Sequence, residues 1–130
     1  MKLINPTDDE LNAAFAEKVA GWTDVRYEEG ENVDIDARVL YPWEGMAGSP
    51  PDGQERRLVP PFTRSMDAVL PWLNAPGWLW HISNDEIHTN RPFTAHIHRG
   101  LAEASASDTN APRACVIALL RANGVEVTFQ

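Results

Sequence analysis

The chain has 130 residues, of which 43% are hydrophobic and 23% charged, a composition typical of one globular domain that folds without disulfides or a structural metal. Nineteen Asp and Glu residues against eleven Lys and Arg residues give a formal charge of −8, which argues against direct nucleic-acid binding because phosphates would be repelled. No apolar run reaches transmembrane length and the N-terminus lacks a signal sequence, so we predict a cytoplasmic protein that does not bind membranes.

The first strong signal is a helix within residues 1–22. Thr7 is a good N-cap, and Glu10 three positions later completes a capping box. Apolar residues recur at helical spacing, and Gly21 provides a natural stop. The face that should cover the core consists of Leu11, Phe15, Val19 and Trp22.

Residues 23–41 give weaker signals. Apolar and polar residues alternate in short runs, and an acidic run at residues 28–31 is typical of a turn. We therefore predict short strands separated by turns. They are expected around Val25 and Tyr27, around Val33 and Ile35, and over residues 38–41.

Residues 42–61 are rich in turn-forming residues. Pro42 is expected to end the preceding strand, and the segment contains five prolines and three glycines. The sequence thus predicts a loop of about twenty residues, longer than most connections in a compact domain. A loop of this length is either functional or mobile.

A second helix is predicted over residues 63–75, with Thr63 or Ser65 as its cap. Pro71 should kink or shorten this helix, because proline removes one helical hydrogen bond.

Residues 77–98 contain two segments that alternate with period two and are joined by a polar loop, a pattern that predicts an antiparallel hairpin. One face of this hairpin is large and apolar, which suits a sheet covered by helices. That face should consist of Trp78, Trp80, Ile82, Phe93 and Ile97.

The C-terminal part begins with residues 101–107, which can extend the sheet. A third helix follows, with Pro112 in its first turn and Gly124 after its end. The lone Cys115 lies in this helix and is expected to be a buried, unreactive thiol. Residues 125–129 alternate as a terminal strand would. The buried stripe of the third helix should be Ala114, Ile117, Ala118 and Leu120.

Three segments together resemble a known family. They are Ala-Glu-Lys-Val-Ala-Gly-Trp at 16–22, Pro-Pro-Phe-Thr at 60–63 and Asp-Thr-Asn-Ala-Pro-Arg-Ala-Cys-Val-Ile-Ala-Leu-Leu at 108–120. Their order and spacing resemble the phage ABA sandwich domain family of bacteriophage and prophage proteins, over about residues 7–120. The resemblance implies a small cytoplasmic protein of phage origin with helices on both faces of a sheet, and it supplies no catalytic or binding residues.

The polar face of the predicted hairpin is one candidate site. His96 and His98 are two residues apart on one strand and point the same way, and His81 has the same facing on the neighbouring strand. Asp85, Glu86 and His88 lie in the joining loop. Imidazole with carboxylate suits zinc or another transition metal, so His81, His96 and His98 are candidate metal ligands of a metal-dependent enzyme. The alternative is a solvated or packed sheet face.

A second candidate is an anion site. Arg56, Arg57 and Arg64 can meet an anion, while Trp43 and Trp72 can stack on a base. Such a site would serve an anti-defence sponge that sequesters a small anionic nucleotide. The alternative is that the tryptophans belong to the core and the arginines are solvated.

These observations predict a single α+β domain over residues 1–130, with an antiparallel sheet of about four strands covered by helices in an α/β/α-type sandwich. No nucleophile elbow, phosphate-binding loop or zinc-protease motif occurs, so we assign no catalytic residue and lean away from an enzyme. The histidine face suggests zinc as a cofactor, and no other cofactor is predicted. The leading hypothesis is a non-enzymatic accessory protein that binds a host protein, since acidity favours a basic partner. A homo-oligomer is compatible with the sequence.

Overall fold

The structure, a computed structural model, describes residues 1–85 and 90–130. Within these ranges the helices are α1 (Asp8–Lys18), α2 (Met66–Leu73) and α3 (Ala111–Ala122), with a 3₁₀ turn η1 (Phe62–Arg64) before α2. The strands are β1 (Lys2–Ile4), β2 (Thr23–Asp34), β3 (Val39–Ser49), β4 (Arg57–Leu58), β5 (Leu79–Asn84), β6 (Phe93–Arg99), β7 (Ala102–Asp108) and β8 (Glu126–Thr128). The predicted α+β class is confirmed.

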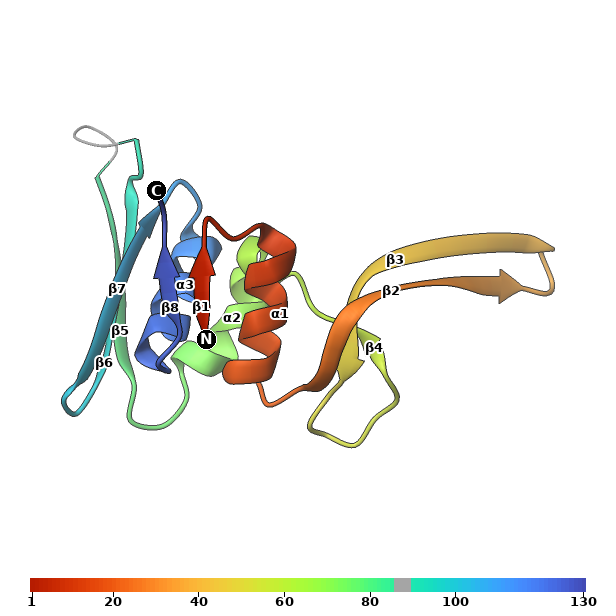
Figure 1. Ribbon diagram of the computed structural model, residues 1–130, viewed down its shortest axis with the longest axis horizontal. Coiled ribbons are helices and arrows are strands. Elements are labelled where there is room, and N and C mark those ends of the chain that lie inside the picture. The colour runs from red at the N-terminus through yellow and green to blue at the C-terminus, as the bar shows by residue number, and fades with distance from the viewer. Residues whose placement is uncertain (86–89) are drawn as a thin grey trace.

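Strands β5, β6 and β7 pair in that order as an antiparallel sheet, and the predicted hairpin of β5 and β6 is present. A second antiparallel sheet has the order β2, β3, β4. The sequence did not predict β1, which pairs in parallel with β8 and brings the two ends of the chain together (Figure 1). Its partner β8 lies within the terminal strand predicted at residues 125–129, whereas the three residues of β1 have no alternating flanks that would reveal a strand.

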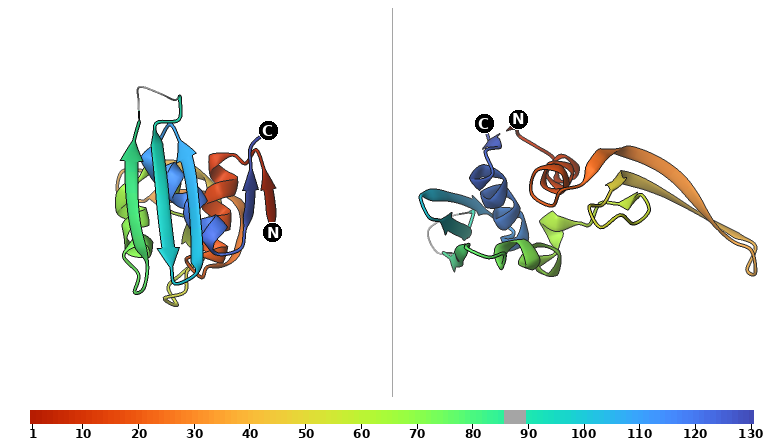
Figure 2. Two further views of the ribbon diagram at one scale, coloured as in Figure 1. Left: turned by 90° about the vertical axis from the view of Figure 1, so that its left-hand side faces the viewer. Right: turned by 90° about the horizontal axis from the view of Figure 1, so that it is seen from below.

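Helix α3 is the central element of the body. It lies between the β5–β7 sheet and the layer formed by α1, α2 and η1 (Figures 1 and 2). The predicted stripe is buried, and Cys115, Val116 and Leu119 on its other sides are buried as well. A helix that is apolar all round requires cover on every side, which explains this central position.

Helix α1 begins as predicted. The Glu10 backbone N–H donates to Thr7 Oγ1 over 3.2 Å, and the Thr7 N–H donates back to Glu10 Oε1 over 3.3 Å. Leu11 and Phe15 are fully buried, and Trp22 joins the core just beyond the end of the helix. The capping box therefore fixes the start of α1 and aims its apolar face at the core.

Helix α2 is shorter than the predicted residues 63–75, mainly at its start, where residues 62–64 form η1. The helix continues through Pro71 to Leu73. It begins after Ser65, whose side chain accepts a hydrogen bond from the Ala68 N–H.

The β5–β7 sheet presents an apolar face to α3 and a polar face to solvent. Ala95 and Ile97 are buried on the inner face, and Trp78, Trp80 and Ile82 pack partly buried against the same core. This sheet has three strands rather than about four. The helices of the described chain lie on its inner side, whereas the family resemblance implies helices on both faces.

The reading of residues 28–61 needs correction. Strand β2 continues through the acidic run at 28–31, and β3 continues through Pro42 to Ser49. Pro42 faces Glu31 on β2, while the opposite edge of β3 has no strand partner there among the described residues. A proline is tolerated at such an edge because no ladder hydrogen bond is lost. The expected loop of residues 42–61 is therefore a strand over its first part.

Candidate functional site

The most exposed feature of the molecule is the hairpin of residues 23–49, called the arm below, which projects away from the body (Figures 1 and 2). Strands β2 and β3 pair from Tyr27 and Met46 at the base to Asp34 and Val39 at the tip. At the turn, the Ala37 N–H donates to Asp34 Oδ1 over 3.0 Å. None of the residues from 26 to 46 contributes to the hydrophobic core of the described chain.

The register places different side chains on the two faces of the arm, since directly paired residues share a face. On one face, Trp43 lies opposite Gly30, and a Cβ added to Gly30 would come within 2.3 Å of the Trp43 indole. The indole therefore covers the glycine, which is the reason for a residue without a side chain at this position. Tyr41 lies on the same face, nearer the tip.

The other face carries carboxylates. Glu29 lies opposite Glu44, and Glu31 lies opposite Pro42. The Tyr27 hydroxyl donates to Glu44 Oε2 over 2.5 Å, and this hydrogen bond is the main cause that raises the pKa of Tyr27 to about 12. An open hollow of about 600 Å³ follows the middle of the arm. It is lined by Glu29, Gly30, Glu31, Pro42, Trp43 and Glu44.

The tip of the arm is apolar and exposed. Ile35 is 82% exposed, Val33 61% and Leu40 58%. Tyr27, Val39 and Tyr41 are exposed as well. Side chains of this size rarely gather in water on a monomer without a binding role.

The arm is strongly negative, because it contains seven acidic residues and two basic residues, Arg26 and Arg38. At its base the charges are paired. Arg56 Nε lies 2.6 Å from Glu28 Oε1, and Arg26 Nε lies 3.0 Å from the same oxygen. Farther out, Glu29 and Glu31 form no ion pair within residues 1–85 and 90–130.

The five residues of the predicted anion site lie in different places. Arg56 holds β2 at the base of the arm, Arg57 packs over the Trp22 ring, and Trp43 lies in the middle of the arm. Trp72 packs edge-on against Phe15 in the helical layer. Arg64 lies 3.6 Å from Asp8.

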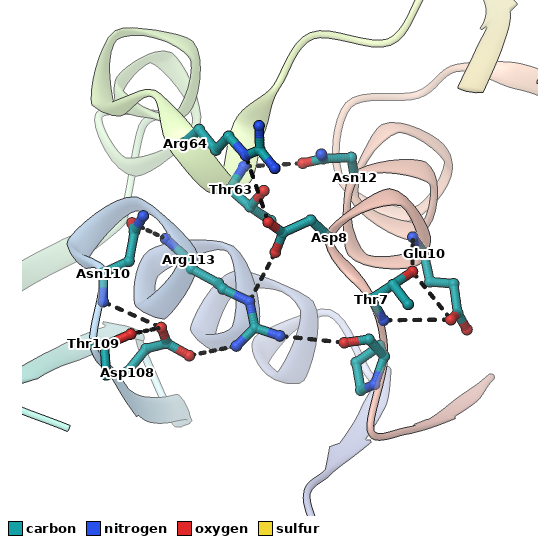
Figure 3. Close-up of polar contacts among 11 residues, drawn as sticks. Thr7, Asp8, Glu10, Asn12, Thr63, Arg64, Asp108, Thr109, Asn110 and Arg113 are labelled. Carbon is teal, nitrogen blue, oxygen red and sulfur yellow. Dashed lines mark hydrogen bonds and ion pairs between the residues drawn. The ribbon is translucent and has the colours of Figure 1, made fainter. Parts of the chain in front are cut away.

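Asp8 connects Arg64 to a polar cluster at the starts of α1 and α3 (Figure 3). Arg113 Nε donates to Asp8 Oδ1 over 2.9 Å, Nη1 donates to Asp108 Oδ2, and Nη2 donates to the Pro6 carbonyl oxygen. The Asn110 side chain caps α3 by accepting from the Arg113 backbone N–H. These contacts hold three segments of the chain together and stabilise the fold.

The predicted metal ligands lie on the outer face of the β5–β7 sheet. The rings of His81 and His96 stack with centroids 4.7 Å apart, and His98 is two residues farther along β6, opposite Leu79. In the described part of the chain, no three His, Cys, Asp or Glu residues gather closely enough to hold a metal ion. Glu86 and His88 lie outside the described residues.

Cys115 is fully buried in α3. Burial raises the pKa of its thiol to about 11, so the thiol is protonated at neutral pH and offers no nucleophile.

The fold is similar to that of a phage protein from Bacillus cereus ATCC 14579, known from a crystal structure. The superposition has a TM-score of 0.62 at 12% sequence identity and covers 90% of this chain and 92% of that protein. At this identity the similarity shows the fold alone. No family model matches the sequence, and no curated protein matches it. No helix within residues 1–85 and 90–130 has the length and apolar character needed to cross a membrane.

Proposed function

We propose that this protein is a phage or prophage accessory protein that acts by binding a protein of the bacterial host through the arm. The observation that carries the proposal is the arm itself, which exposes apolar side chains on a hairpin that the core does not use. An exposed apolar surface has a favourable free energy of burial against a partner.

The charge of the arm indicates what kind of partner fits. Glu29 and Glu31 have no cation beside them within the described residues, and Glu44 lines the same hollow. A partner surface with Lys or Arg side chains around an apolar centre complements this arrangement, and such complementarity gives both specificity and rapid association.

We also infer that the chain belongs to the phage ABA sandwich domain family. The support is the order of its three characteristic segments, together with the fold that it shares with a phage protein. With a phage or prophage origin, we propose that the protein acts in the cytoplasm of a bacterial host.

Binding to a protein is better supported than the two alternatives. Arg56 and Arg57 already contact carboxylates, and the two candidate stacking residues lie in separate parts of the fold, which disfavours a nucleotide sponge. Two of the three histidines proposed for a metal-dependent enzyme lie side by side without a third ligand close enough among the described residues.

Site-specific photo-crosslinking in bacterial cells tests the proposal. A photoreactive residue replaces Leu40 on the arm or, as the matched control, Leu79, which is also exposed but lies on the outer face of the β5–β7 sheet. We expect a discrete cross-linked host protein from position 40 and none from position 79. The same cross-links from both positions, or none from position 40, would contradict the proposed role of the arm.

A further inference from the structure

Strand β2 is an edge strand along its whole length. Among the strands of residues 1–85 and 90–130, the sheet order β2, β3, β4 gives it one neighbour, β3. About half of the backbone N–H and C=O groups of such a strand point away from its only partner and are available for another strand. A β-bulge interrupts β2 between Thr23 and Arg26, where Asp24 has φ of +52°, and the regular edge runs from Arg26 to Asp34. This regular part is still longer than β5, which has six residues.

The other edge of the arm is a poorer template. Pro42 lies in the middle of β3 and has no N–H to donate. Gly45 has φ of +151°, outside the conformation of a regular strand. Toward the base, β4 already occupies this edge at Ala47 and Gly48. An added strand is therefore accommodated by β2 rather than by β3.

The side chains of β2 select what kind of strand fits. Tyr27, Glu29, Glu31 and Val33 follow one another on one face, and this face would lie directly beside the side chains of a new strand. A second copy of β2 would bring glutamates next to glutamates, which is unfavourable. A strand that carries Lys or Arg at alternate positions would bring cations next to Glu29 and Glu31.

We propose that β2 receives an extended basic segment of a partner protein as an additional strand of the arm. Backbone hydrogen bonds to the free edge hold the segment, and alternate Lys or Arg side chains lie beside Glu29 and Glu31. This proposal rests on the proposed function and specifies its partner. The competing explanation is that the carboxylates only prevent edge-to-edge aggregation.

The test uses a nine-residue peptide of alternating Lys and Val with the full-length protein. Binding is measured by fluorescence anisotropy, and backbone hydrogen exchange is measured residue by residue. We expect slower exchange in β2 and unchanged exchange on the outer edge of β3. The Glu29→Gln/Glu31→Gln variant should bind at least about tenfold more weakly, whereas Glu103→Gln, on the far sheet, should bind as the parent does. Unchanged exchange in β2 would overturn the proposal.

N-methylated peptides separate strand addition from simple charge attraction. Methyl groups on alternate backbone nitrogens block only one edge of the peptide strand. One of the two methylated series should lose at least about tenfold in affinity, and the other should not. Equal binding by both series would overturn the proposal. If the peptide fails to bind while position 40 still cross-links a host protein, strand addition is wrong and the arm's role in partner binding stands.

Discussion

Arg113 holds the starts of α1 and α3 together. Its guanidinium donates to the carboxylates of Asp8 and Asp108 and to the Pro6 carbonyl oxygen. The Asp108 side chain is 8% exposed and that of Arg113 22%, so water screens this pair little. By contrast, the Arg26 side chain is 61% exposed in its pairs with Asp24 and Glu28.

Replacing Arg113 with Ala should lower the free energy of unfolding by about 3 kcal/mol, because the Asp108 carboxylate loses its cation while it stays buried. The control Arg26→Ala should cost less than about 1 kcal/mol, as exposed ion pairs usually do. Urea denaturation followed by tryptophan fluorescence measures both values. Equal losses of unfolding free energy in the two variants would show that the buried Arg113 cluster stabilises the fold no more than an exposed ion pair does.

The Cys115 thiol makes stability depend on alkaline pH. Burial raises its pKa from 9.0 to about 11, so between these values the unfolded chain loses the thiol proton and the native state keeps it. The stabilisation is complete below pH 9 and is lost as the pH rises toward 11, by about 1.4 kcal/mol per pH unit for this group.

The Cys115→Ala variant lacks this titration. Its unfolding free energy should therefore fall less steeply than that of the parent between pH 9 and 10, as measured by urea denaturation at each pH. Parallel pH profiles for the two proteins would mean that the thiol is not held protonated.

At the scale of elements, the arm and the body differ in what stabilises them. The helices and the β5–β7 sheet bury a common core around α3, and within residues 1–85 and 90–130 no residue from 26 to 46 belongs to that core. The arm depends instead on its own ladder, on the Trp43 indole over Gly30 and on the Arg56 ion pairs at its base. We therefore expect the fold of the body to tolerate changes in the arm.

Shortening the arm should leave the body folded. Removing residues 30–43 and joining Glu29 to Glu44, which pair directly, through Asn-Gly gives a two-residue hairpin turn. We expect the free energy of unfolding to change by less than about 1 kcal/mol, because no core surface is exposed. A loss of more than about 3 kcal/mol would show that the body depends on the arm.

The elements of the body were predictable because local signals agree with tertiary packing. The capping box of Thr7 and Glu10 predicts the start of α1. The alternation of residues around Trp80 and Ile97 predicts which side chains of β5 and β6 point toward the core. The arm was not predictable in the same way. A two-stranded ribbon outside the core buries neither face, so apolar and polar residues do not alternate regularly along its strands. In addition, Pro42 predicts the end of a strand, although it is tolerated on the edge of β3 that β2 does not occupy.

The candidate sites were less predictable than the fold. The predicted anion site combines Arg56, Arg57 and Arg64 with two tryptophans because of their residue types. In the structure the three arginines form ion pairs with carboxylates, mostly from distant segments of the chain, and a local sequence pattern does not reveal such pairs. The carboxylates are those of Asp24, Glu28, Asp52 and Asp8. The acidic run at residues 28–31 predicts only a turn. Short strands are predicted around Val33 and Ile35 and over residues 38–41, which flank or overlap the tip of the arm, but nothing in the sequence predicts that they pair as a long hairpin outside the core.

At the scale of the whole molecule, the protein consists of a helical and sheet body with one long acidic projection (Figure 1). A similar fold occurs in a Bacillus cereus phage protein at 12% identity, which shows that this fold is compatible with very different sequences. Seven of the nineteen acidic residues lie within residues 23–49. Attraction of a basic partner to the arm should therefore dominate association.

Salt should weaken this association. Exposed charges are screened within about 10 Å at 0.1 M ionic strength and within about 3 Å at 1 M. Capture of the partner by the full-length protein should therefore decline as ionic strength rises, while an association governed only by the apolar tip would persist or strengthen. Quantitative mass spectrometry of captured proteins at several salt concentrations measures this dependence.

The most direct test compares affinity capture from a bacterial lysate by the full-length protein and by the shortened-arm variant, at equal concentration and low salt. We predict that a partner with a basic surface is enriched by the full-length protein and lost with the shortened arm, although both proteins are folded. An identical set of captured proteins with and without residues 30–43 would contradict the conclusion that the arm is the binding element.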